Sequence, residues 1–447
     1  MKYNHVFNVF LSLFVSLSFA SASPDTSLPR NISSTTLENG VRVLVKEDHR
    51  NPSVIINFVY HVGSTDESTT QRGVAHFVEH AMFLGTISQN RNQQALYVSE
   101  HTSFSNGYTT PNFTCFSFGS TPEHLQKIIE LQADRTLNLA FDSKTIENER
   151  KVILEERAML VENDPWGEIN EVWNTLAYPT SSYHHPHIGW ESDIKSIHRS
   201  DLIKWYKTWY TGDNLSVIVV GDVSPNEVIQ LVRSHFRNIP KTHAGRKRID
   251  KTEKVHPTEI RSEIFARLKR PYYAIGFKIP SVKNIKEELI FSMIKEVLAN
   301  PDDGLLSLRL VDRSHILNNL QASYTLFSHT NGLFELSGTP NSNTHFYSFK
   351  GKVLETLSNI KESDISDQNL QNIKTLIKSN IAFEQNSLQT QMDTLVMLDH
   401  FNLPLNFKDY YQVNTTLNGI TKKDIIDTIK RHFIDTPQRI LLSVKPL

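Results

Sequence analysis

The sequence has one cysteine and no excess of either charge, and each absence excludes a class of protein. A single cysteine cannot form a disulfide within the chain, so Cys115, in a phenylalanine-rich stretch, is predicted to be a buried apolar residue. The formal net charge of −1 over 447 residues gives no attraction to nucleic acid or anionic lipid. The basic run at residues 241–254 has no interleaved aromatic residues, so it is interpreted as a solvated linker. No nucleic-acid partner is expected.

The first 22 residues have the layout of a secretory signal peptide. A short positive segment precedes the apolar run Val6–Phe19, and Ala20-Ser21-Ala22 offers a small-x-small cleavage site. The run is too short to span a bilayer comfortably, so we expect cleavage after Ala22 and no stable membrane anchor. An uncleaved anchor is the alternative. An exported chain without disulfides fits a bacterial periplasm, so we expect a periplasmic or secreted bacterial protein.

Two histidines and a glutamate form a compact motif within residues 72–86. The apolar residues there recur at helical spacing, and residues four apart on a helix share a face, which places His76 beside His80. Two imidazoles so placed can bind zinc, and Glu79 lies within the same turn. The order His-x-x-Glu-His is the inverse of the commoner zinc-protease motif. A charged helix face without metal would also explain so short a motif.

A second segment could supply the third ligand that a catalytic zinc needs. Residues 144–162 are rich in strong helix formers and contain neither Gly nor Pro. Glu149 and Glu156 are seven apart and so line one stripe, with Val152 between them. Carboxylates on a stripe that faces the interior are costly unless they are paired or bound to metal. A solvated charged helix is the alternative, and it is the preferred interpretation of the other glutamates of this segment.

These residues resemble the M16 family of zinc peptidases. In that family a helix with two glutamates seven apart follows the inverted motif after some seventy-odd residues, and here Glu156 follows His80 by 76 residues. The resemblance implies that His76, His80 and Glu156 bind one zinc ion per chain. It also implies that Glu79 is the general base and that Glu149 supports the site.

Other segments extend the resemblance from about residue 33 to the C-terminus. Residues 37–45 resemble the opening hairpin of the family, and residues 106–114 resemble its Asn-Ala-x-Thr-x-x-Asp-x-Thr pattern, an edge strand that receives substrate. By that resemblance Asn106 binds substrate. The sequence departs from the pattern at Gly107, where the family has Ala, and at Asn112, where it has Asp.

The chain contains a faint internal repeat with an offset of 223 residues. Residues 197–203 and 420–426 each begin a helix that runs into an apolar strand, at 217–219 and 440–442 respectively. The chain is also too long for one ordinary core, so two similar α+β domains are predicted, at residues 33–240 and 261–447, joined by a linker at 241–260. The resemblance implies that each domain is a mainly antiparallel sheet flanked by helices, and that the two close like a clam. The repeat position of His76 falls near residue 299, where no ligand set is found.

One departure concerns the substrate site. The family usually has an Arg and, seven residues later, a Tyr in its second domain, and Tyr324 fits the Tyr position. Leu317 stands where the Arg is expected, and Arg309 and Arg313 have the wrong spacing. The resemblance therefore suggests a homodimer, or a heterodimer with an M16-like subunit that carries the Arg and Tyr.

The expected function is that of a zinc-dependent endopeptidase that hydrolyses peptides or unfolded segments. A non-catalytic partner or scaffold subunit of the same fold is the main alternative, although such members normally lose the zinc residues. A zinc hydrolase of non-peptide amides is another alternative. The histidines at 184, 185 and 187 are interpreted as packing residues of a loop, because they lie outside the spacing of the zinc motif.

Overall fold

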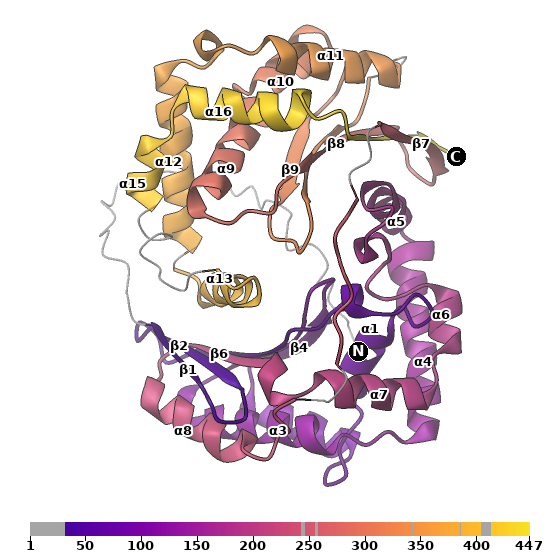
Figure 1. Ribbon diagram of the computed structural model, residues 1–447, viewed down its shortest axis with the longest axis vertical. Coiled ribbons are helices and arrows are strands. Elements are labelled where there is room, and N and C mark those ends of the chain that lie inside the picture. The colour runs from indigo at the N-terminus through magenta and orange to yellow at the C-terminus, as the bar shows by residue number, and fades with distance from the viewer. Residues whose placement is uncertain (1–31, 243–245, 255–257, 342–343, 385, 404–412) are drawn as a thin grey trace.

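The computed structural model describes residues 32–242, 246–254, 258–341, 344–384, 386–403 and 413–447. The predicted signal peptide lies outside these ranges. Within them the chain forms two sheets, each covered by helices (Figure 1). Among the described residues, no helix combines the length and apolar character that crossing a membrane requires.

The first half of the chain builds a sheet in the order β1-β2-β6-β3-β5-β4. Its strands are β1 (Ile32–Thr36), β2 (Arg42–Glu47), β3 (Val54–Tyr60), β4 (Phe104–Thr109), β5 (Thr114–Ser120) and β6 (Leu215–Gly221). Its helices are α1 (Val74–Ala81), α2 (Arg91–His101), α3 (Leu125–Asn138), α4 (Ser143–Arg157), α5 (Pro165–Ala177), α6 (Glu191–Ser196), α7 (Arg199–Trp209) and α8 (Pro225–Phe236).

The second half builds a sheet in the order β7-β11-β8-β10-β9. Its strands are β7 (Ile260–Ala266), β8 (Tyr272–Ile279), β9 (Gln321–Thr325), β10 (Gly332–Gly338) and β11 (Arg439–Pro446). Its helices are α9 (Ile285–Ala299), α10 (Leu305–Ser307), α11 (Phe346–Asn359), α12 (Asp367–Glu384), α13 (Leu388–His400), α15 (Val413–Gly419) and α16 (Lys422–Ile429).

The two sheets share one topology. Strands β2, β6, β3, β5 and β4 correspond in order to β7, β11, β8, β10 and β9, and in each sheet only the first of these pairs is parallel. The 223-residue offset relates the start of α7 to that of α16 and the start of α5 to that of α13. The predicted fold, two similar domains with mainly antiparallel sheets, is confirmed. In the described part of the predicted linker no helix or strand precedes β7.

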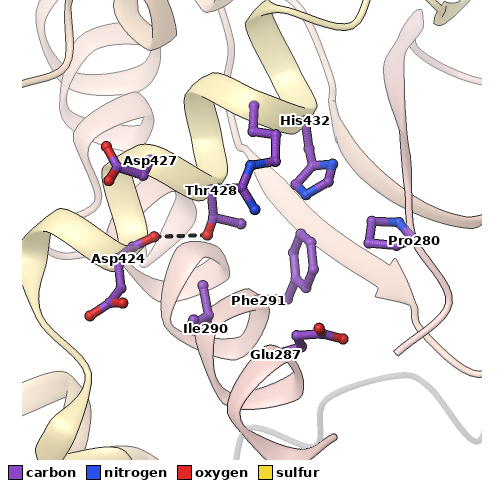
Figure 2. A pocket seen from close by; sticks show the side chains of 9 residues that line it. Pro280, Glu287, Ile290, Phe291, Asp424, Asp427, Thr428 and His432 are labelled. Carbon is purple, nitrogen blue, oxygen red and sulfur yellow. Dashed lines mark hydrogen bonds between the residues drawn. The ribbon is translucent and has the colours of Figure 1, made fainter. Parts of the chain in front are cut away.

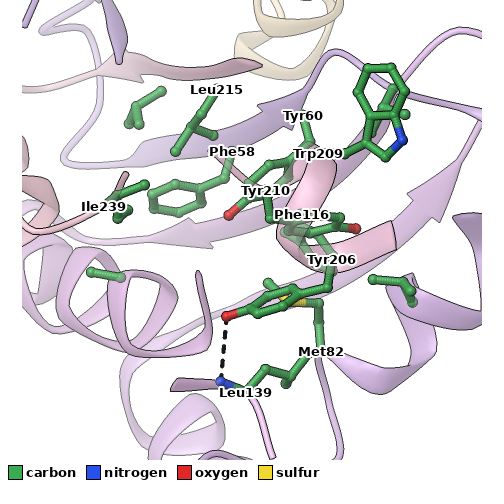
Figure 3. Close-up of a cluster of buried hydrophobic side chains, with 14 of the residues drawn as sticks. Phe58, Tyr60, Met82, Phe116, Leu139, Tyr206, Trp209, Tyr210, Leu215 and Ile239 are labelled. Atoms are coloured by element: carbon green, nitrogen blue, oxygen red, sulfur yellow. Dashed lines mark hydrogen bonds between the residues drawn. The ribbon is translucent and has the colours of Figure 1, made fainter. Parts of the chain in front are cut away.

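The central strands β3, β5 and β6 are buried along their whole length, which explains the nearly continuous apolar sequences of β3 and β6. One face packs against helices of the same half around an aromatic cluster (Figure 3). The ring centroids of Tyr60 and Tyr210 lie 4.1 Å apart, and the hydroxyl of Tyr206 donates to the carbonyl of Thr136 at 2.6 Å. The phenol of Tyr206 thus combines a large apolar area with a satisfied polar tip.

The opposite face of each sheet is covered by a helix from the other half. Helix α13 packs Met392 and Leu395 against the first sheet, in an apolar cluster that also contains the buried Cys115. Helix α5 packs Trp173 against the second sheet, over Gly276. A Cβ atom at Gly276 would lie only 3.0 Å from the indole, so glycine allows this close approach. Because α5 and α13 occupy equivalent repeat positions, the two halves exchange matching helices.

Candidate metal centre

Helix α1 is fixed at its start by a buried carboxylate. Gly73, at the N-cap, has φ of 92°, a left-handed conformation that favours glycine. The amides of Gly73 and Ala75 donate to Glu67 at 2.7 and 2.8 Å, and these are the groups that a helix N-terminus leaves without partners. Burial raises the pKa of Glu67 well above its ordinary value. His185 Nε2 lies 3.2 Å from the same carboxylate.

His76, His80 and Glu156 converge, as the family resemblance implies. One ligand atom of each lies within 4.8 Å of the others, and they form the only such group of three among the described residues. Glu156 Oε2 lies 3.8 Å from His76 Nε2 and 3.2 Å from His80 Nε2. The predicted interior stripe on α4 is wrong at Val152, which is 42% exposed. Three residues of helix rotate a side chain by 300° rather than a full turn, so Val152 diverges from the glutamates.

Two successive contacts hold the Nδ1 side of the His80 ring. Its Nδ1 lies 2.9 Å from Glu149 Oε1, and the other oxygen of Glu149 accepts from Arg91 Nη1 at 3.3 Å. Burial lowers the pKa of His80, but the nearby carboxylates of Glu149 and Glu156 outweigh burial and raise that pKa to about 10. A carboxylate at Nδ1 fixes the ring orientation and leaves Nε2 pointing at Glu156.

Nδ1 of His76 and Oε2 of Glu156 are buried and have no hydrogen-bond partner among the described residues. Burial, followed by the charge of His80, lowers the pKa of His76 well below its ordinary value, so the imidazole stays neutral, as a metal ligand must be. Glu156 Oε2 is buried and accepts no hydrogen bond within the described residues. Buried polar atoms normally have partners. The donor set of two imidazoles and a carboxylate matches a catalytic zinc site, so these residues fit that metal.

Glu79, on α1, lies beside these three residues, and its side chain faces β4. Its Oε2 is 3.8 Å from His76 Nε2 and accepts a hydrogen bond from the Thr109 hydroxyl at 3.2 Å. Burial raises the pKa of Glu79 to about 7. A Cβ atom at Gly107 would lie 2.8 Å from Glu79 Oε1 and equally close to the ring of Phe83. The glycine that departs from the family pattern therefore leaves room for this carboxylate.

The structure places the two predicted substrate residues differently. Asn106 is exposed on β4, next to Gly107 and three residues before Thr109. Tyr324 lies on β9, and its ring packs against Phe334 at a centroid distance of 6.2 Å. Burial raises the pKa of Tyr324 to about 12. The alternation of β9 turns this side chain into the core of the second half, so its predicted contact with substrate has no support from this arrangement.

The histidine loop is mainly a packing element, as expected. His184 Nδ1 lies 2.7 Å from the carbonyl oxygen of Ser181, and His185 Nε2 lies 2.9 Å from that of Ser64. His187 is different, because its ring centroid lies 6.2 Å from that of His76. Burial lowers the pKa of His187 to about 4. No spacing signal in the sequence pointed to His187, Arg91 or Thr109 as neighbours of the metal centre.

A separate hollow lies in the second half, between α9 and α16, with a volume of about 320 Å³ (Figure 2). Both carboxylates and cations line it: Pro280, Glu287, Ile290, Phe291, Asp424, Asp427, Thr428, Arg431 and His432. It contains none of the residues of the metal centre.

Comparison with known families agrees with this geometry. A family model described as insulinase, peptidase family M16, matches residues 42–175, and one described as peptidase M16 inactive domain matches residues 196–377. The chain belongs to the M16 family. The predicted resemblance is thus confirmed, and both halves of the repeat fall within it.

Several relatives of this M16 chain are named as proteases. It is 24% identical over 439 residues to the zinc protease PqqE of Helicobacter pylori, covering 96% of this chain and 95% of that protein. It is 30% identical over 211 residues to the mitochondrial-processing peptidase subunit beta of Bos taurus, covering 47% of this chain and 43% of that one.

Solved structures share the whole fold. A crystal structure of a protease from Helicobacter pylori superposes with a TM-score of 0.84 at 23% identity, covering 94% of this chain and 100% of that chain. The periplasmic protease PqqL from Escherichia coli superposes with a TM-score of 0.80 at 18% identity, covering 95% of this chain and 48% of that chain. At these identities the likeness establishes the fold.

Proposed function

We propose that this M16 chain is a zinc-dependent endopeptidase that cleaves peptides or unfolded segments. The observation that carries the proposal is the convergence of His76, His80 and Glu156 with Glu79 beside them. The names of the relatives, zinc protease and processing peptidase, support the same reaction class.

Each residue of the centre has a role in this proposal. His76, His80 and Glu156 would hold one zinc ion, and Glu149 would orient His80. A bound zinc ion polarises a carbonyl and lowers the pKa of water toward ~7. Glu79, with a pKa raised to about 7 by burial, can accept a proton near neutral pH and return it to the leaving amine. The Thr109 hydroxyl holds one oxygen of Glu79, which leaves the other free to move the proton.

The edge of the first sheet supports a peptide substrate. Strand β4 ends the sheet and pairs only with β5 among the described strands, so its outer edge can accept an extended peptide as an added strand. Asn106 lies on this strand and would contact the peptide backbone. The same strand carries Gly107, which leaves room for Glu79, and Thr109, which donates a hydrogen bond to it. The docked backbone would therefore run beside the proposed base.

Location and partners belong to the same proposal. The predicted signal peptide, together with the likeness to the periplasmic protease PqqL, supports a periplasmic or secreted enzyme. Leu317 in place of the expected Arg supports a dimer, either of two copies or with an M16-like subunit that carries the Arg and Tyr. A monomer with full peptidase activity would contradict that part.

The test of the proposed function is zinc content together with peptide cleavage. The purified chain should hold about one zinc ion, and His76→Ala and Glu156→Gln should each lose it, since each removes one of three ligands. Glu79→Gln should keep the zinc and lose at least ~100-fold of the peptidase activity, in the range for removal of a general base. A Glu79→Gln variant that remains active would refute the base assignment. A folded chain that takes up no zinc would favour the alternative of a non-catalytic scaffold subunit.

A further inference from the structure

Three histidines, none of them part of the candidate metal centre, form a hydrogen-bonded row between the two halves. His61 follows β3 of the first half, whereas His400 ends α13 and His329 lies between β9 and β10 in the second half. His61 Nδ1 lies 3.0 Å from His400 Nδ1, and His400 Nε2 lies 3.0 Å from His329 Nε2. His400 therefore uses both ring nitrogens, one toward each neighbour.

The two ends of the row differ. His61 Nε2 lies 2.8 Å from the Ser216 hydroxyl and 3.4 Å from Asp399 Oδ2, in a buried setting. His329 is exposed at the other end, and its backbone amide donates to the Tyr183 hydroxyl at 3.0 Å. All three imidazoles border a cavity of about 560 Å³ between the halves. The row thus runs from a buried carboxylate to a surface that solvent reaches.

The number of ring hydrogens limits how much positive charge the row can accept. Each of the two nitrogen-to-nitrogen bonds needs one hydrogen, and three neutral imidazoles carry three ring N–H hydrogens. The third hydrogen therefore lies on an outer nitrogen, that of His61 or that of His329. One added proton fills the other end and leaves both bonds intact. A second added proton must set two N–H groups against each other in one of the bonds. That bond then breaks, and the two imidazolium rings repel each other.

Charged groups from several elements face the row. Asp399 favours a first proton on His61, and Arg42 of β2 pairs with the same carboxylate at 2.9 Å. The positive charges of Lys251 and Arg248 disfavour a proton on His400, and Asp66 lies near His329. Burial is the largest effect on His400, and it lowers the pKa of His400 well below the ordinary value.

We propose that His61, His400 and His329 form a proton-sensitive latch that ties α13 to the first sheet and loosens in acid. The latch is closed when the row carries at most one added proton. A further proton breaks one of the two bonds of the row, and the His61–His400 bond is the one that joins α13 of the second half to the end of β3 of the first. Wherever loosening lets water reach His400, its pKa returns toward the ordinary value of about 6.5, so acid favours the loosened state.

Hydrogen exchange of the α13 backbone tests the latch without any measurement of activity. The protection of peptides from residues 388–403 is compared at pH 7 and pH 5, after correction for the intrinsic exchange rate. In the native chain we expect protection to fall about tenfold, the effect of one pKa unit of displacement. His400→Gln keeps a donor and an acceptor in the row but cannot be protonated, so its protection should change by less than about twofold.

Matched variants separate the latch from other titrating groups. Asp393, on the same helix, has a pKa raised by burial, so it also titrates in acid. Asp393→Asn should keep the acid response of the native chain, as should His345→Asn, which changes an exposed histidine far from the row. If His400→Gln does not fold, His61→Gln replaces it. Unchanged protection in the native chain, or an acid response in His400→Gln equal to the native one, would overturn the latch.

Discussion

Lys278 is an ammonium group buried at the junction of the two halves. It lies on β8, is 4% exposed, and its Nζ lies 3.5 Å from the ring centroid of Tyr178. Within the described residues this nitrogen has no hydrogen-bond partner. Burial lowers the pKa of Lys278 to about 7, and the negative charge of Glu253 offsets only part of that effect. We predict that Lys278→Met stabilises the protein.

The magnitude and its pH dependence follow from this pKa. A lysine whose pKa is lower in the folded than in the unfolded chain destabilises the fold at every pH below the unfolded value. The displacement from 10.5 to about 7 corresponds to at most about 5 kcal/mol, because one pKa unit is about 1.4 kcal/mol. We expect Lys278→Met to gain roughly 2–4 kcal/mol at pH 7. The gain should shrink as the pH rises toward 10.5, where the lysine is neutral in both states.

Urea unfolding of the native chain and of Lys278→Met at pH 7 and pH 9.5 measures this gain. Lys374→Met is the matched control, because the Lys374 ammonium is also poorly exposed but donates to the carbonyls of Asn418 and Ile420 at 3.1 and 2.7 Å. The control should lose about 1–3 kcal/mol, the cost of leaving buried acceptors unpaired. A Lys278→Met variant that is no more stable at pH 7, or whose gain is the same at both pH values, would refute the reasoning.

Two further predictions concern the base and the exchanged helices. Thr109→Val removes the hydroxyl that holds Glu79, so kcat on a peptide should fall about tenfold, with KM and zinc content little changed. Thr109→Ser should restore kcat. A lost zinc ion, or no rescue by Ser, would argue for a purely structural role. Trp173→Ala removes the side chain that packs α5 against the second sheet and should lower the free energy of unfolding, measured in urea, by about 3–5 kcal/mol. Trp166→Ala, which changes an exposed tryptophan, should lower it much less.

The zinc motif could be predicted from the sequence because its information is local. Helical spacing places His76 beside His80, and a seven-residue interval, nearly two full turns, places Glu149 and Glu156 on one face of their helix, whatever the rest of the chain does. The internal repeat likewise predicted two similar domains, because each copy retains its own helix and strand pattern. The contact between α1 and α4 came from the family resemblance rather than from the pattern of either helix.

Contacts that depend on tertiary packing could not be predicted in the same way. Helix α13 buries Met392, Leu395 and Val396, but nothing in their spacing says that it covers the sheet of the other half. The Thr109 hydroxyl reaches Glu79 only because β4 passes beside α1. Tyr324 was assigned to substrate from its position in a family pattern, whereas the alternation of β9 decides that it faces the core. The three histidines of the latch come from distant segments and have no common motif.

The exchanged helix α5 connects the metal centre to a half that supplies no ligand. Glu156 ends the metal-facing part of α4, and the chain passes from there through the π-helix Ala158–Glu162 directly into α5. The next residue, Arg157, is buried and joins Glu171 of α5 at 2.8 Å. Since α5 is docked on the second sheet, the position of Glu156 depends on that sheet, even though none of the described residues of the second half belongs to the ligand set. A domain without catalytic residues can therefore still be required for the geometry of the site.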